Sequence, residues 1–272
     1  MLLWRLPAST DLIRKPDTPR LRVAAVGFLN TSPLVWGLLH GPQKGEMDVE
    51  FCTPSECADR LEAARADIGI VPVIELARLG LEIIPGCCIA SRGPVRSILL
   101  ISRIAPHSIR TLAADTSSRT SVALARIVLA ERHGAEPQIL PMAPDLPAML
   151  EAADSALIIG DTALRLDVGA LPYQVLDLGA EWTAWTGKPM VFAVWAGRPE
   201  LPMDQLERTF RASAAFGREH MDDIARTEGP ARGIPGALAR EYLTRRIVFD
   251  LGEQELEGMN LFLNYAARGV AA

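Results

Sequence analysis

The stretch IRTLAADTSSRTSVALARIVLAERHG, residues 109–134, contains one complete unit of the expected fold. Its apolar start, 109–114, predicts a buried strand, and residues 120–133 predict a helix that ends at Gly134, a common helix-ending residue. A strand, a short polar turn and a helix in this order form the repeating unit of α/β proteins. The turn between strand and helix consists of Asp115, Thr116, Ser117, Ser118, Arg119, Thr120 and Ser121.

This turn has the composition of an anion-binding site. The first backbone N–H groups of a helix have no partner within it, and the helix dipole favours negative charge there. Hydroxyl groups and the Arg119 guanidinium would add charge-assisted hydrogen bonds to a carboxylate or a phosphate. A helix cap needs only one hydroxyl, however, so Ser117 or Ser118 could simply cap the helix while Arg119 lies in solvent. The residues by themselves leave both interpretations open.

The same α/β pattern recurs on both sides of this stretch. Residues 21–27 and 68–71 read as buried strands, and residues 146–159 read as a helix followed by a strand. Short apolar runs that alternate with helices are typical of parallel strands buried on both faces. Ligands of open α/β sheets bind at the carboxyl ends of the strands, so residues there should meet in one cleft between two similar lobes. The residues that directly follow the expected strands include Asn30, Pro72, Asp115, Gly160 and Asp161.

The two lobes are expected to be joined by a hinge of two crossing strands. The chain would cross first at 93–101 and return near 191–195, and closure of such a hinge can expel water from the cleft. This is the layout of a two-lobed solute-binding protein. Helices that return the chain to the first lobe are expected at 203–226, 234–246 and 254–267. The predicted organisation is an N-terminal extension at 1–20, lobe 1 at 21–98 plus 196–272, and lobe 2 at 99–195.

The composition limits the classes of partner. A net charge of −5 without a concentrated basic face argues against a nucleic-acid partner, since phosphate binding needs such a face. No apolar run approaches the roughly 18 residues of a membrane span. Residues 1–20 lack the continuous apolar core of a secretory signal. We therefore expect a cytoplasmic protein with a small-molecule ligand, no nucleic-acid partner and no membrane contact.

The cysteines and histidines form no recognisable metal site. Adjacent Cys87 and Cys88 are poorly placed to bind one tetrahedral ion, and Cys52 and Cys57 are separated by four residues instead of two. The histidines share no motif, and the Gly-x-Gly-x-x-Gly, P-loop and His-Glu-x-x-His patterns are all missing from the sequence. The sequence therefore predicts chemistry without a metal, a cofactor or an obvious nucleophile.

Five blocks of the chain resemble, in their order and spacing, the chorismate dehydratases of the futalosine route of menaquinone biosynthesis. The resemblance extends over about residues 21–270, and five ordered blocks are far more specific than any one of them. It implies an α/β, two-lobed periplasmic-binding-protein type II fold without a cofactor. It also implies a hydro-lyase that converts chorismate to 3-[(1-carboxyvinyl)oxy]benzoate by loss of the C4 hydroxyl and the C3 proton. The blocks are Phe28–Thr31, Gly93–Ser97, Asp115–Ser121, Leu157–Asp161 and Glu181–Trp195.

The resemblance also implies roles for individual residues. Asn30 and Ser97 are the implied catalytic residues and would hold the leaving hydroxyl or the enolpyruvyl group. Neither side chain is a competent base at neutral pH, and in this family the substrate's own side-chain carboxylate has been suggested as the base. A substrate carboxylate would be held by Ser118, Arg119, Thr120 and Ser121. The other substrate-binding candidates are Thr31, Arg96, Gly160, Asp161, Trp182, Thr186 and Gly187.

Structural roles compete with several of these assignments. Asn30 could cap the turn before Pro33, and Ser97 could be a small residue required where a crossing strand packs closely. Asp161 could cap the helix that follows it. Trp182 could be a core aromatic, and Arg96 could pair with a carboxylate of its own chain instead of the substrate.

Two other functions fit the same sequence. One is a non-catalytic carboxylate-binding protein of solute-binding fold. The other is the sister enzyme of the futalosine pathway, which acts on a cyclic futalosine derivative and shares the fold. The block Thr186–Pro189 supplies no hydrolytic base for that second reaction, and chorismate turnover would separate all three functions.

Overall fold

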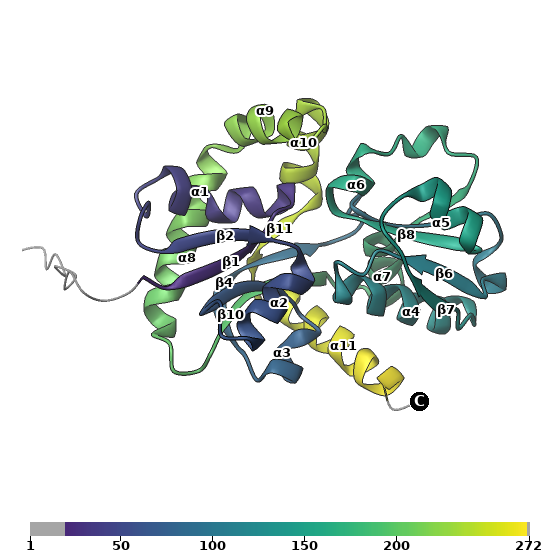
Figure 1. Ribbon diagram of the computed structural model, residues 1–272, viewed down its shortest axis with the longest axis horizontal. Helices are drawn as coiled ribbons and strands as arrows, with labels where there is room; N and C mark the ends of the chain where they lie inside the picture. The colour runs from purple at the N-terminus through teal and green to yellow at the C-terminus, as the bar shows by residue number, and fades with distance from the viewer. Residues whose placement is uncertain (1–19, 271–272) are drawn as a thin grey trace, which may run out of the picture.

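Two β-sheets, each with helices packed on both faces, make up the part of the chain that the computed structural model describes, residues 20–270 (Figure 1). The six-stranded sheet and its helices are called the first lobe here, and the five-stranded sheet and its helices the second lobe. The N-terminal extension expected at 1–20 lies outside the described residues except for residue 20. No helix within residues 20–270 is long and apolar enough to span a membrane.

The six-stranded sheet has parallel strands on one side and antiparallel strands on the other. Strand β1 runs parallel to both β2 and β3, whereas β10 runs antiparallel to β3 and β4, and β11 runs antiparallel to β4. The strands expected at 21–27 and 68–71 are confirmed, but the sheet is mixed and not wholly parallel. In spatial order its strands are β11 (Val248–Leu251), β4 (Glu82–Ser91), β10 (Met190–Gly197), β3 (Ile68–Pro72), β1 (Arg22–Val26) and β2 (Asp48–Cys52).

The five-stranded sheet is also mixed. Strand β6 runs parallel to β7 and β8, whereas β5 runs antiparallel to β8 and β9. All residues of β5 and β8 are buried, as expected for central strands that are covered on both faces. In spatial order its strands are β7 (Gln138–Pro141), β6 (Thr111–Ala114), β8 (Ser155–Ile159), β5 (Ile98–Ser102) and β9 (Gln174–Asp177).

Helices cover both sheets, and one of them contacts both lobes. Helix α11 packs on β10 of the first lobe and on α4 of the second, and it crosses below the junction in Figure 1. The helices of the first lobe are α1 (Ser32–His40), α2 (Pro54–Glu62), α3 (Glu75–Leu79), α8 (Met203–Glu219), α9 (Met221–Ala231), α10 (Gly236–Glu241) and α11 (Glu253–Val270). Those of the second lobe are α4 (Arg119–His133), α5 (Leu146–Ala152), α6 (Gly160–Arg165) and α7 (Leu178–Thr186).

The return crossing lies earlier in the chain than the sequence predicted. Strand β10 pairs with β3 from Ala193 opposite Pro72 to Gly197 opposite Ile68, so it belongs to the first lobe throughout. The chain therefore returns between the end of α7 and Met190, not near 191–195. A buried apolar strand has the same pattern in either sheet, and only its long-range pairing decides which sheet it joins.

The C-terminal helices are more divided than expected. The predicted helix 203–226 is interrupted at His220, where α8 ends and α9 follows. The predicted helix 234–246 consists of α10 and a wider π-helical turn, Tyr242–Arg246. The helix expected at 254–267 is α11.

Helix α4 follows its sequence signals closely. Ser118 lies before its first turn, and the Ser118 hydroxyl accepts a hydrogen bond from the Ser121 backbone N–H at 3.4 Å. Gly134 adopts a left-handed conformation, φ +63°, just after the last turn. The capping role expected for Ser118 is confirmed, and the helix begins at Arg119, one residue before the predicted start.

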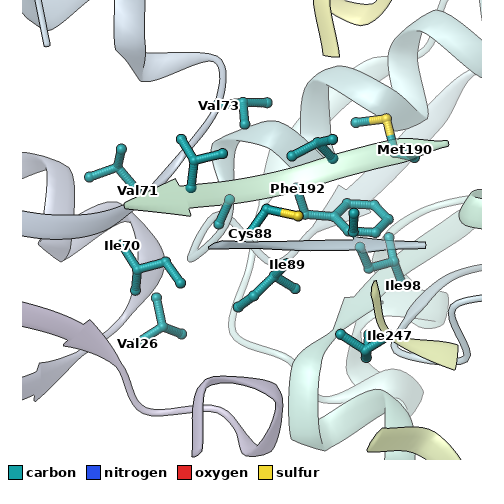
Figure 2. Close-up of a cluster of buried hydrophobic side chains, with 14 of the residues drawn as sticks. Val26, Ile70, Val71, Val73, Cys88, Ile89, Ile98, Met190, Phe192 and Ile247 are labelled. Carbon is teal, nitrogen blue, oxygen red and sulfur yellow. The ribbon is translucent and has the colours of Figure 1, made fainter. Parts of the chain in front are cut away.

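The larger hydrophobic core extends across both lobes. Figure 2 shows Ile89 of β4 and Phe192 of β10 close to Ile98, which belongs to β5 of the second lobe. Apolar side chains from both sheets thus share one buried cluster, and the crossing segments pass through it. Burial of this shared surface holds the two lobes together at the crossing segments.

Gly217→Ala is expected to destabilise the protein because α8 crosses α1 at this residue. A Cβ atom at Gly217 would overlap the Pro33 carbonyl group, and neither backbone can move freely inside two packed helices. Overpacking of this kind costs about 1–3 kcal/mol of unfolding free energy, which urea unfolding would measure. Gly169→Ala is the control, since the nearest atom to its added Cβ is 3.6 Å away. If Gly217→Ala and Gly169→Ala have the same free energy of unfolding, α1 and α8 do not pack as closely at Gly217 as described.

Candidate functional site

A pocket lies between the lobes, at the carboxyl ends of β1, β3 and β8 and at the amino ends of β5 and β10. Its apolar wall includes Val26 of β1, Ile89 of β4 and Phe192 of β10, all drawn in Figure 2, together with Ile98 and Ile159 from the second lobe. The convergence expected from the sequence is thus confirmed for Asn30, Pro72 and Gly160, which all line the pocket. None of the described residues that line it is ionisable. The polar side chains among them are Asn30, Ser97, Ser118 and Ser121.

Ser97 is held at the pocket by the backbone of the first crossing segment. The Asp177 carboxylate accepts hydrogen bonds from the backbone N–H groups of Val95 and Arg96, at 3.0 and 2.6 Å. The Ser97 carbonyl accepts from the Gly160 N–H at 2.8 Å. These bonds fix the chain on both sides of the Ser97 Cα atom. Ser97 is 2% exposed and lines the pocket.

Asn30 and Ser97 are joined through the hydroxyl of Tyr242. The Asn30 side-chain amide donates to this hydroxyl at 3.0 Å, and the hydroxyl donates to Ser97 Oγ at 2.9 Å. Asn30 lies in a short 3₁₀ turn after β1, so the three residues come from separate parts of the chain. Burial raises the pKa of Tyr242 well above its ordinary value. Sequence reasoning missed Tyr242, and no local motif marks it.

The amino-terminal end of α4 forms the second polar part of the pocket. The Ser118 and Ser121 hydroxyls lie 3.0 Å apart and both residues line the pocket. The backbone N–H groups of Arg119 and Thr120 are the first two of the helix and have no carbonyl partner within it. Hydroxyl donors and a helix amino terminus together suit an anionic group of a ligand.

Arg119 does not line the pocket, contrary to the expectation that it holds a ligand carboxylate. Its Nη2 donates to Asp59 Oδ1 at 2.8 Å, and its Nη1 lies 3.4 Å from Glu75 Oε1. Both carboxylates belong to the first lobe, and the buried Glu75 also pairs with Arg78 of its own helix. The Arg119 side chain therefore connects the lobes. Thr120 also lies outside the pocket, where its hydroxyl oxygen accepts from the Ile74 N–H at 3.4 Å.

Asp161 likewise connects the lobes and does not line the pocket. Its Oδ1 accepts from the Leu29 backbone N–H of the first lobe at 3.0 Å, and its Oδ2 lies 3.4 Å from Nε of Arg232. Burial raises the pKa of this carboxyl. The expected capping of its own helix is not observed, because α6 has no side-chain cap. Gly160 before it has φ +59°, and a Cβ there would meet the Phe28 ring across the pocket.

Arg96 has a structural role in the second lobe. Its guanidinium donates to the carbonyl groups of Ala163 and Leu166, at 2.9 and 2.6 Å, where α6 ends. Its backbone has φ +67°, which is uncommon for a residue with a Cβ atom and is compensated by the bond to Asp177. Arg96 was expected to bind substrate, but it does not line the pocket, and its guanidinium binds these two carbonyl groups of its own lobe.

The remaining candidates also lie outside the pocket. Trp182 is fully buried and its indole N–H donates to the Pro189 carbonyl at 3.1 Å, so it is a core aromatic. The Thr186 hydroxyl donates to the Trp182 carbonyl, and Gly187 ends α7 in a left-handed conformation. Thr31 is fully buried beside Asn30. This block and Thr31 therefore shape the fold around the site and do not contact the pocket.

The cysteines of the described chain are free thiols. Cys52 and Cys57 lie next to each other with their sulfur atoms 3.1 Å apart, whereas Cys87 and Cys88 lie in the buried sheet. Within residues 20–270 no three His, Cys, Asp or Glu side chains come together in the way a metal site requires. No residue of the pocket wall is a usual metal ligand either.

Residues 21–268 match the protein family described as menaquinone biosynthesis. The chain is 30% identical over 198 residues to the chorismate dehydratase of Thermus thermophilus, a match that covers 67% of this chain and 72% of that protein.

Solved structures with low sequence identity share the fold. Protein AF1704 of Archaeoglobus fulgidus superposes with a TM-score of 0.75 at 16% identity, over 93% of this chain and 98% of that one. The periplasmic aliphatic sulphonate binding protein SsuA of Escherichia coli superposes with a TM-score of 0.64 at 14% identity, over 94% and 89%. The two-lobed periplasmic-binding-protein fold expected from the sequence is confirmed.

Asp161 should make the protein less stable as the pH rises. Because burial raises the pKa of its carboxyl above the ordinary 3.8, the folded chain keeps this proton at pH values where the unfolded chain has lost it. The free energy of unfolding therefore falls as the pH rises between the two pKa values. Asp161→Asn removes this titration and keeps an oxygen for the Leu29 N–H. Urea unfolding at several pH values should show that the free energy of unfolding of this variant lacks the fall caused by Asp161.

Asp154 provides a control of opposite sign. Hydrogen bonds from the Arg110 and Thr111 backbone lower the pKa of Asp154, so its contribution to stability increases with pH. In the wild-type protein, Asp154 makes the free energy of unfolding rise with pH, and Asp154→Asn should remove this rise. Asp161→Asn should instead remove a fall. If the free energy of unfolding of Asp161→Asn changes with pH in parallel with that of the wild-type protein, Asp161 does not have a raised pKa in the folded chain.

Proposed function

The chain belongs to the menaquinone-biosynthesis family, and from this membership and the pocket we propose that it is a chorismate dehydratase. The reaction removes the C3 proton and the C4 hydroxyl of chorismate and yields 3-[(1-carboxyvinyl)oxy]benzoate. The proton and the hydroxide together make one water molecule, so the enzyme is a carbon–oxygen lyase that needs no co-reactant. The aromatic product supplies the driving force, and the protein has to orient the substrate and stabilise charge.

The observation that carries this proposal is a pocket wall with polar side chains but no ionisable one. A hydrolytic or metal-assisted reaction would need a general base or a ligand set at the reacting atoms. Dehydration of chorismate does not, because the substrate brings two carboxylates of its own. The enolpyruvyl carboxylate is the base in this proposal, and the closed apolar pocket holds it against the C3 proton. An apolar surrounding also strengthens that carboxylate as a base, since desolvation disfavours its charged form.

The two polar parts of the pocket have separate tasks. Asn30 and Ser97 hold the leaving C4 hydroxyl, with Ser97 as hydrogen-bond donor to its oxygen. The ring carboxylate lies at the amino terminus of α4, near the Ser118 and Ser121 hydroxyls. Charge that develops on the ring and its carboxylate as the C3 proton leaves is stabilised there by the helix end. The apolar side chains between these two parts contact the ring.

The contacts between the lobes keep water out of this pocket. Leu29 N–H bonds to Asp161, Ser55 N–H bonds to the Ser117 carbonyl at 2.9 Å, and Arg119 bonds to Asp59. All three join the first lobe to the second. A closed cleft excludes water, which would compete for the hydrogen bonds of the leaving hydroxyl and solvate the basic carboxylate.

Incubation of the purified protein with chorismate tests the function directly. Formation of an aromatic product, 3-[(1-carboxyvinyl)oxy]benzoate, by chromatography and ultraviolet absorbance is the expected result. A carboxylate-binding protein would bind chorismate and return it unchanged. The sister enzyme of the pathway would leave chorismate unchanged and consume a cyclic futalosine derivative instead.

Ser97→Ala and Asn30→Ala should each lower kcat more than they raise KM. Their hydrogen bonds become stronger as the hydroxyl leaves, and removal of one preorganised donor at such a position costs about 100-fold or more in rate. Steady-state kinetics with chorismate would measure both constants, and melting temperatures would report stability. A variant that loses stability but keeps its specific activity would show that the residue has a packing or capping role instead.

A chorismate analogue with the enolpyruvyl carboxylate converted to an amide should bind without losing water. The protein side chains that could replace this base are the carboxylates of the matching blocks, Asp115, Asp161 and Glu181. Loss of a general base costs about 10²–10⁴ in rate, so Asp115→Asn, Asp161→Asn and Glu181→Gln should each have only modest effects. Turnover of the amide analogue would refute the substrate base, and a thousandfold loss in one folded variant would identify a protein base.

A further inference from the structure

Tyr242 lies between the two implied catalytic residues but has been given no role in the reaction. It is 1% exposed, and its hydroxyl contacts both Asn30 and Ser97. We propose that Tyr242 is a positioning residue, which orients Asn30 and Ser97 as an acceptor–donor pair for the leaving hydroxyl of the substrate. This inference rests on the proposed function, because the leaving hydroxyl is that of chorismate.

The hydrogen-bonding capacity of the three groups determines their orientation. A phenol has one hydrogen to donate, and Tyr242 donates it to Ser97 Oγ at 2.9 Å. Ser97 must therefore direct its own hydrogen elsewhere, and Ser97 lines the pocket. The Asn30 amide nitrogen donates to the Tyr242 oxygen at 3.0 Å. The other end of the same amide, Oδ1, is buried and has no hydrogen-bond partner among the described residues.

These bonds leave one hydroxyl donor, on Ser97, and one amide acceptor, on Asn30, for a group bound in the pocket. An alcohol group of a ligand is complementary to this pair, since it can donate to Asn30 Oδ1 and accept from the Ser97 hydroxyl. A buried amide oxygen without a partner is costly, so a ligand hydroxyl that satisfies it gains binding energy. A bond from Ser97 to the leaving oxygen becomes stronger as that oxygen gains negative charge.

Tyr242 acts through these two residues and does not itself transfer a proton to the substrate. Burial is the main cause that raises the pKa of Tyr242, and the charge of Asp161 raises it further, against hydrogen bonds that lower it. The phenol therefore stays neutral and remains a donor to Ser97 throughout the reaction. A chain of hydrogen bonds from Asn30 through Tyr242 to Ser97 also polarises the Ser97 hydroxyl.

The local backbone supports a functional reason for this geometry. Tyr242 begins the π-helical turn Tyr242–Arg246, which is wider than the α-helix before it. The Ile247 N–H donates to the Tyr242 carbonyl at 3.3 Å and closes this turn. Such widened turns are rare and are frequent at functional sites. Here the widened turn starts at the residue whose side chain reaches the two polar groups of the pocket.

Tyr242→Phe in the full chain tests the inference, because it removes the hydroxyl and keeps the ring in the core. We expect kcat with chorismate to fall roughly tenfold to hundredfold, with little change in KM, since the donor and acceptor lose their orientation. The double variant Tyr242→Phe/Ser97→Ala should be slower than Ser97→Ala by a smaller factor than Tyr242→Phe costs in the wild-type protein, because one of the two residues through which Tyr242 acts is already removed. Tyr265→Phe is the matched control. Its ring packs on Trp182 and Trp185 away from the pocket, and its activity should be that of the wild-type protein.

A second measurement does not depend on turnover. The side-chain amide resonances of Asn30 in ¹⁵N-labelled protein should shift in Tyr242→Phe and stay unchanged in Tyr265→Phe, because only Tyr242 accepts from that amide. Absence of this shift would overturn the hydrogen-bonded pair itself. If the wild-type protein converts chorismate, the positioning role is overturned by an unchanged kcat in Tyr242→Phe. It is also overturned by losses that multiply in the double variant.

Failure of the proposed function would look different. If the wild-type protein leaves chorismate unchanged, the assignment of the leaving hydroxyl falls together with the dehydratase proposal. The amide resonances would in that case still show whether Tyr242 orients Asn30. The melting temperature of Tyr242→Phe, compared with that of Tyr265→Phe, separates these outcomes from a general loss of folding.

Discussion

The Asp177 carboxylate holds the segment on which the rest of the site depends. It accepts hydrogen bonds from the backbone N–H groups of Val95 and Arg96 in the crossing segment, and from that of Ala180 in α7. The crossing segment is thereby attached to the second lobe, with Arg96 in a conformation that few residues with a Cβ atom adopt. Ser97 follows directly, and the position of its backbone at the pocket is a consequence of this attachment. A carboxylate that receives three backbone N–H groups is a rigid anchor, because none of them can leave without an uncompensated polar group.

The charged side chains near the cleft bind the lobes to each other instead of facing the pocket. Arg119 spans to Asp59 and Glu75, and Asp161 spans to the Leu29 N–H and Arg232. Each of these contacts would be broken by opening of the hinge. The pocket wall between them is left without an ionisable group. Such a wall suits a substrate that brings its own charges, since a fixed base or cation beside its carboxylates would compete with the substrate-assisted reaction proposed above.

The fold of periplasmic binding proteins explains how such a pocket is built. In this architecture the carboxyl ends of the strands from both sheets face one cleft, so small polar groups after several strands meet there. Asn30 follows β1, Ser97 precedes β5, and Ser118 precedes α4. A binding protein needs these groups only to hold a ligand. Placing Ser97 and Asn30 around a hydroxyl that can leave would turn the same cleft into a catalytic site.

Much of this arrangement is local and could be predicted from the sequence. The strand–turn–helix unit at 109–134, the cap at Ser118 and the left-handed Gly134 all follow from short-range patterns of apolar residues and helix-ending residues. The pocket residues Asn30, Ser118, Ser121 and Gly160 were among the predicted candidates because they lie after strands or at a helix start, whereas Ser97 was a candidate only through the family resemblance.

Long-range contacts decided the rest. The sheet that β10 joins depends on partners more than a hundred residues away, so its lobe could not be predicted from its own sequence. Arg119 lies in a turn with the composition of an anion-binding site, and only the carboxylates of Asp59 and Glu75 in the other lobe show where its side chain binds. Tyr242 carries no local signal, and its role depends on Asn30 and Ser97, which lie 212 and 145 residues away in the chain. Sequence patterns determine helices, strands and caps, because these depend on residues close together in the chain. The direction of a buried polar side chain depends instead on hydrogen-bond partners that come next to it only in the folded protein.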